Sequence, residues 1–154
     1  MWDPELEVLW ALGIEYLRAY KVTGTLERPE LEQVENYRLP SDGGHDLYAV
    51  YGAENALWIT TSDEVYQFNT RTKEFTTDYP GHSDFVSTAS VKGIGNQPFS
   101  GTIITMIPNG AMYTWNSDTI DLYRPEQDES YIHEAKVHSA NAFYKVRAWY
   151  PNYR

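Results

Sequence analysis

The feature that most constrains the fold is a change of hydrophobic period at His45. Beyond this residue apolar side chains recur at every second position, in short runs rich in β-branched and aromatic residues, and Gly, Asn, Asp or Pro separates most runs. Such alternation is typical of strands with one buried face. We therefore expect eight or nine strands, drawn from 47–51, 56–61, 64–69, 73–79, 85–91, 102–107, 111–116, 119–123 and 142–150.

The first residues predict a helix instead. Asp3 and Pro4 form a helix-entry signal, since an Asp side chain accepts from free backbone N–H groups and Pro suits the first helical position. Gly24 marks the end of a run of apolar residues at helical spacing, namely Leu6, Leu9, Trp10, Leu17 and Tyr20. Residues 28–39 are ambiguous, because Pro29 followed by acids favours a second short helix whereas alternating apolar residues would suit an extended segment.

These patterns predict a single α+β domain spanning residues 1–154, with a helical N-terminal segment at 1–40 and a β-rich body at 45–154. The N-terminal helix is expected to pack on a predominantly antiparallel, multi-hairpin β-sheet or sandwich. A chain of 154 residues buries roughly 70% of its unfolded surface, so it needs no disulfide or metal to hold a core.

A shift of 47 residues aligns two parts of the β-rich body. The aligned pairs include Leu57/Ile104, Ile59/Met106, Tyr66/Tyr113, Phe68/Trp115 and Asn69/Asn116. Each copy consists of two hairpins and resembles the strand-turn-strand units of β-propeller blades. Two copies cannot close a propeller of at least four blades. The pattern predicts paired or stacked β-units with equivalent faces, and the alternative is a chance likeness between short hairpins.

Composition removes several function classes. The chain has no cysteine, which excludes disulfide scaffolds, cysteine-ligated metals and a thiol nucleophile. Residues 1–130 hold 21 acids and 8 bases, a net charge of −13, and residues 131–154 hold one acid and four bases, a net charge of +3. The overall charge of −10 argues against nucleic acid as a partner. No signal peptide or transmembrane segment is recognised, which predicts a cytoplasmic or virion-associated protein without a membrane partner.

No catalytic or metal-binding pattern survives a geometric test. His133 and His138 are five residues apart, which separates their rings on a helix and on a strand alike. His82 lies beside Ser83 and Asp84 in a segment better read as a turn. Convergence of His45, His82, His133 and His138 on a metal stays open, but nothing in their spacing requires it. We therefore predict no enzyme activity, no catalytic or metal residues and no cofactor.

Aromatic residues provide the main functional signal, because an alternating strand with a solvent face cannot bury all of them. Phe143, Lys145, Arg147 and Trp149 would share one face of the last strand as a basic-aromatic strip. This strip could meet an acidic neighbour, a nucleic-acid base or the acidic body of the same chain. Our interface candidates are Phe143, Lys145, Arg147, Trp149, Tyr153, Tyr66 and Tyr113.

The favoured function is a non-enzymatic protein-interaction or assembly module, such as a structural subunit of a larger phage- or virus-like particle. Its partner would be a second copy or a neighbouring subunit. Two alternatives remain open. One is a small acidic inhibitor or immunity-type protein that occupies a basic site on an enzyme, and the other is a carbohydrate-binding or metal-dependent hydrolytic domain.

Overall fold

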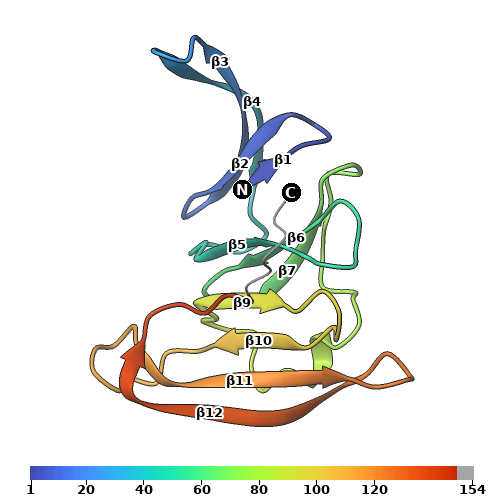
Figure 1. Cartoon of the computed structure of the whole chain (residues 1–154), viewed down its shortest axis with the longest axis vertical. Coiled ribbons are helices and arrows are strands. Elements are labelled where there is room, and N and C mark those ends of the chain that lie inside the picture. The colour runs from blue at the N-terminus through green and yellow to red at the C-terminus, as the bar shows by residue number, and fades with distance from the viewer. Residues whose placement is uncertain (149–154) are drawn as a thin grey trace.

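Three four-stranded antiparallel sheets follow one another along the chain in a computed structural model that describes residues 1–148 (Figure 1). Sheet A contains β1 (Trp2–Asp3), β2 (Val8–Leu12), β3 (Tyr16–Gly24) and β4 (Pro29–Arg38). Sheet B contains β5 (Asp46–Ala49), β6 (Ala56–Thr60), β7 (Val65–Asn69) and β8 (Phe75–Thr76). Sheet C contains β9 (Gly93–Asn96), β10 (Ile103–Met106), β11 (Ser117–Pro125) and β12 (Tyr131–Phe143).

Each sheet is a meander whose strands lie side by side in chain order. The first strands, β1, β5 and β9, lie toward the middle of the molecule, whereas the tip of the β3–β4 hairpin and strand β12 lie at its two ends (Figure 1). Four-stranded meanders that fan out from their first strands are the arrangement of β-propeller blades. Three such sheets form an open fan rather than a closed ring.

The expected N-terminal helix is wrong, and with it the α+β class. The regular secondary structure of residues 1–148 is almost entirely β, and its single helical element is the short 3₁₀ turn η1 (His82–Asp84). The side chain of Asp3 does cap free backbone groups, since its Oδ1 accepts hydrogen bonds from the N–H groups of Glu5 and Leu6 at 3.1 Å. The chain then continues into strand β2 instead of a helix. Gly13 forms the turn to β3, where its N–H donates to the carbonyl of Tyr16 at 2.8 Å. Pairing of β2 with β3 therefore overrides the helical spacing of the leucines.

The second expected helix, at 28–39, is also wrong, and the extended alternative describes this segment as β4. Gly24 does not end a helix. It turns the β3–β4 hairpin, where its φ of +81° is a left-handed conformation that favours glycine.

Most of the strands expected after His45 occur, and five segments differ. Segments 85–91 and 111–116 lie in loops, because loop residues 77–92 fill the core between sheets and residues 107–116 connect β10 to β11. Strand β9 was missed because its Gly-Ile-Gly-Asn sequence lacks a β-rich composition. Strand β12 was missed over most of its length because its residues are largely polar and exposed. The strand expected at 142–150 is not formed at 144–148, and its end lies outside the described residues.

Sheet B is buried on both faces, and its two faces form two separate cores. Leu57, Ile59 and Phe68 pack against Val8, Trp10, Leu17 and Ala19 of sheet A. Trp58 and Val65 pack against Ile94, Ile103 and Tyr123 of sheet C, with Tyr79, Phe85 and Val91 from the connecting loop. Because Leu57 and Trp58 are neighbours on β6, adjacent residues of one strand serve opposite cores.

The 47-residue spacing corresponds to the first strands of sheets B and C, since β9 begins 47 residues after β5. The spacing does not extend to the third strands. Tyr113 and Trp115, which align with Tyr66 and Phe68 of β7, lie in the loop before β11.

Removal of one buried methylene from the core between sheets A and B should lower the stability of the protein. Ile59 is fully buried, so Ile59→Val should lower the free energy of unfolding by about 1 kcal/mol. Ile14 is 65% exposed, and Ile14→Val should change it by less than about 0.5 kcal/mol. Urea unfolding of the two variants provides the comparison, and equal effects would contradict this assignment of the core.

Candidate functional site

Asp46 joins three segments of the chain near the middle of the fan. It is the first residue of β5, and its side chain is 1% exposed. Its carboxylate accepts the backbone N–H of Ile94 on β9 at 3.0 Å and Nη1 of Arg147 at 2.6 Å, and Lys145 Nζ lies 3.4 Å away. A buried carboxylate needs such partners, because an unpaired charge in the interior is costly. Asp46 therefore fastens segment 144–148 to sheets B and C.

Positive charge gathers around this carboxylate. Lys145 Nζ donates to the carbonyl of His45 at 2.7 Å, and Lys92 Nζ lies 3.2 Å from each ring nitrogen of His45. Burial lowers the pKa of His45, and the charges of Lys92 and Lys145 lower it further against the opposing effect of Asp46. Burial and the charge of Lys145 also lower the pKa of Lys92. An open cavity of about 420 Å³ adjoins the cluster on the side of β2.

The residues of the expected basic-aromatic strip are only partly described. Phe143 is the last residue of β12, half-buried and opposite Ser117. Lys145 and Arg147 turn toward Asp46, so they contact an acidic residue of their own chain. Trp149 and Tyr153 lie outside the described residues.

The two remaining aromatic candidates lie in different environments. Tyr66 is half-buried on β7, with its hydroxyl 3.2 Å from Ser41 Oγ and its ring edge-on to Phe75. Tyr113 is 55% exposed in the loop before β11, and its ring stacks on Trp115 with centroids 5.3 Å apart. Tyr66 and Tyr113 therefore contact different residues. Among residues 1–148, no contact joins either of them to the basic-aromatic strip.

The four histidines do not share a partner. His82 pairs with Glu64 at 3.0 Å, His133 pairs with Asp121 at 2.8 Å, and His45 lies beside Lys92. His138 is exposed on β12. Within residues 1–148, no group of three or more His, Asp or Glu side chains is placed to hold a metal ion.

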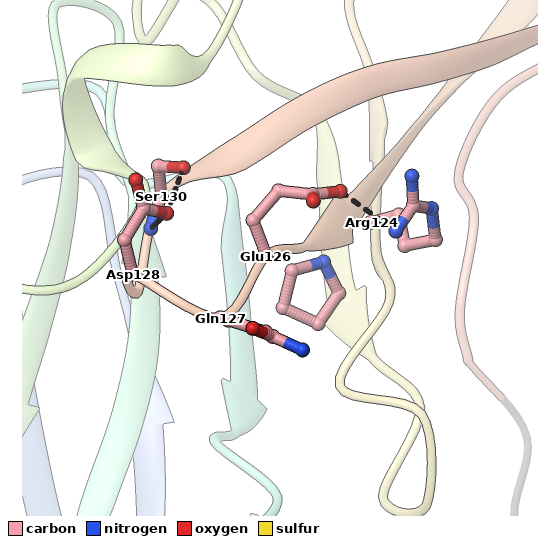
Figure 2. Close-up of a pocket in the computed structure, with 6 residues that line it drawn as sticks. Arg124, Glu126, Gln127, Asp128 and Ser130 are labelled. Carbon is pink, nitrogen blue, oxygen red and sulfur yellow. Dashed lines mark hydrogen bonds and ion pairs between the residues drawn. The ribbon is translucent and has the colours of Figure 1, made fainter.

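A hollow lies at the β11–β12 turn (Figure 2). It measures about 670 Å³ and is formed by one short stretch of chain, residues 124–130. Arg124 pairs with Glu126 at 2.7 Å, and the Ser130 hydroxyl donates to Asp128 at 2.6 Å, which together with the Ser130 N–H lowers the Asp128 pKa. Its charged groups are thus engaged with their own turn, as Figure 2 shows, and do not converge on a common point.

Sheet C has an apolar face that points away from sheet B. Ile103 and Tyr123 face sheet B, so Ile104 and Leu122, which pair with each other, face the opposite way. We call this side the sheet-C open face, made of Ile104, Ile120, Leu122, Ala135 and Val137. Segment 144–148 lies against its inner end, where Val146 and Ala148 approach Gly93 and Gly95.

Corresponding faces of sheets A and B are buried. The cross-strand pair Trp10–Ala19 of sheet A matches Trp58–Gln67 of sheet B and Ile104–Leu122 of sheet C. Trp10 is 1% exposed beneath sheet B, and Trp58 is 2% exposed beneath sheet C. Ile104 faces the same direction along the stack of sheets but is only half-buried.

Sheet A has the second open face. Trp10 and Ala19 face sheet B, so the alternating residues of β2 and β3 face away from it. We call this side the sheet-A open face, made of Trp2, Leu9, Ala11, Arg18, Tyr20, Val22 and Leu31. Trp2, Val22 and Leu31 are each about half-exposed.

Sequence reasoning missed Asp46 as a junction and missed both open faces. The signal for Asp46 was an acid at the start of an apolar strand together with basic residues at alternate positions near the C-terminus. The open faces depend on which side of each strand meets a neighbouring sheet, and alternation alone does not reveal this.

The fold and these surfaces define an open fan of blade-type β-sheets with an apolar face at each end. The chain belongs to a family of unknown function, DUF6528, whose model matches residues 8–132. No curated protein and no solved structure matches it. Among the described residues, no helix is both long and apolar enough to cross a membrane.

Loss of the Asp46 charge should destabilise the protein. Asp46→Asn leaves Arg147 without its counter-charge, and breaking a buried pair costs about 3 kcal/mol. The exposed pair of Arg71 with Glu5 is the control, and Glu5→Gln should cost less than about 1 kcal/mol. Urea unfolding measures both, and a loss at Asp46 no larger than at Glu5 would contradict the junction.

Lys92→Gln should raise the pKa of His45 toward its ordinary value, because it removes one of the two positive charges that depress it. The rise should be partial, since burial remains. A depressed His pKa means that the unfolded chain binds the proton more readily, so stability falls as pH drops below about 6.5. NMR titration of His45 gives the pKa, with Lys21→Gln on β3 as the control. An unchanged or lower His45 pKa would contradict the cluster.

Proposed function

We propose that this protein is a non-enzymatic assembly module that associates with other β-sheet units through the two open faces of its fan. The main support for the proposal is that most of the sheet-C open face is uncovered. Its Ile104 matches Trp10 and Trp58, which lie buried in the two sheet-to-sheet interfaces of the chain. Beyond segment 144–148, no described element packs on this face.

Physical considerations favour a partner for these faces. Apolar side chains gain about 25 cal/mol per Å² when removed from water, and contiguous apolar patches on soluble proteins mark interaction sites. The sheet-C open face holds Ile, Leu, Val and Ala at five positions on three neighbouring strands. Sheets that pack face to face bury surfaces of this kind. A further β-sheet is therefore the partner that such a face fits best.

The buried carboxylates support an assembly module better than an enzyme. The buried carboxylate of Asp121 pairs with His133 and Lys136, and that of Asp46 pairs with Lys145 and Arg147. Both carboxylates are committed to contacts that hold strands together. This favours a packing role over catalysis.

Site-specific photo-crosslinking tests the proposal. A photoreactive phenylalanine analogue at Leu122 should yield adducts with another polypeptide in an extract of the cells that produce the protein. The same analogue at Val86, which is 60% exposed but lies on neither open face, should not. Mass spectrometry identifies the peptide joined to position 122. Equal yields at positions 122 and 86, or no adduct at 122, would count against an interaction through sheet C.

A further inference from the structure

The two open faces lie on opposite sides of their sheets with respect to the direction of stacking. Within the chain, sheets always stack in the same direction: the Trp10 side of sheet A meets sheet B, and the Trp58 side of sheet B meets sheet C. The sheet-C open face continues this direction through Ile104. The sheet-A open face lies on the other side of its sheet. It is the side on which a sheet preceding sheet A would pack.

Cross-strand pairs show what a receiving side looks like. Sheet B receives sheet A on the pair Leu57–Phe68, and sheet C receives sheet B on the pair Ile103–Tyr123. In each pair an aliphatic residue lies opposite an aromatic one, and none of the four is more than 5% exposed. The corresponding pair of sheet A is Leu9–Tyr20, which has the same chemistry but is only half-buried on the sheet-A open face.

We propose that a second copy of this chain docks head to tail, with the sheet-A open face of each copy packed on the sheet-C open face of the other. This inference rests on the proposed function and names its partner. Residues 1–148 of one copy contain both halves of this interface, so a second copy can supply the matching half for each. Contacts between two different patches close into a ring when the rotation between copies allows it.

The number of sheets suits closure. Closed rings of blade-type sheets contain four to eight blades. Each copy supplies three sheets, so two copies make a ring of six. Both open faces of each copy are then covered.

The mass of the purified protein in solution is the first test. Light scattering on a sizing column should give twice the chain mass of 17.8 kDa. Leu122→Lys and Tyr20→Lys each place a charge in one half of the interface and should each raise the dimer dissociation constant by at least about a hundredfold. Both positions lie on open faces, so each variant should fold as a monomer. Val86→Lys is the matched control and should remain a dimer.

Mixing the two variants tests the head-to-tail arrangement. A Leu122→Lys copy keeps an intact sheet-A open face, and a Tyr20→Lys copy keeps an intact sheet-C open face. An equal mixture should therefore regain dimers through the one interface that carries no lysine. If sheet C instead met sheet C, Leu122→Lys alone would block the dimer and Tyr20→Lys would leave it intact. That pattern, or species larger than a dimer, would overturn the ring.

Failure of this inference is distinguishable from failure of the proposed function. A wild-type protein that stays monomeric at every concentration would overturn the second copy as partner. Crosslinks from position 122 to a different polypeptide would then leave the assembly function in place. A monomer without such crosslinks would remove both.

Discussion

Burial of sheet B on both faces is the constraint on which the rest of the structure depends. Along β6, alternate residues serve opposite cores, with Leu57 and Ile59 against sheet A and Trp58 against sheet C. A strand buried on both sides fixes its neighbours in register and direction, because a slip by one residue would exchange the two cores. The direction of stacking set by sheet B is also what gives sheets A and C open faces of opposite kinds.

Hairpins were predictable from the sequence, and the sheets that they form were not. Short runs of β-branched and aromatic residues located β6, β7 and β10 to within a few residues. The prediction for the N-terminal segment was wrong because its apolar residues fit both a helical and a strand period. Pairing of Leu9 with Tyr20 and burial of Trp10 beneath sheet B favour the strand, and the sequence alone shows neither. Local capping by Asp3 was real, yet it closes a turn instead of opening a helix.

Some candidate site residues could be recognised from the sequence, and others only from the fold. Lys145 and Arg147 could be singled out by charge, but their partner Asp46 lies about a hundred residues away and is found only through the fold. Conversely, Ile104 and Leu122 look like ordinary strand residues in the sequence. Their significance comes from cross-strand pairing, which shows that equivalent residues in sheets A and B are buried. The proposed function therefore rests on which faces remain uncovered, which no sequence motif marks.

NMR of the isoleucine methyl groups tests most directly whether the two open faces cover each other. A soluble paramagnetic probe broadens the signals of exposed methyls, so Ile104 and Ile120 report on the sheet-C open face. In the wild-type protein both should be protected, and Tyr20→Lys, a substitution on the other end sheet of the fan, should expose them. Equal broadening of these methyls in the wild-type protein and in Tyr20→Lys would contradict the account.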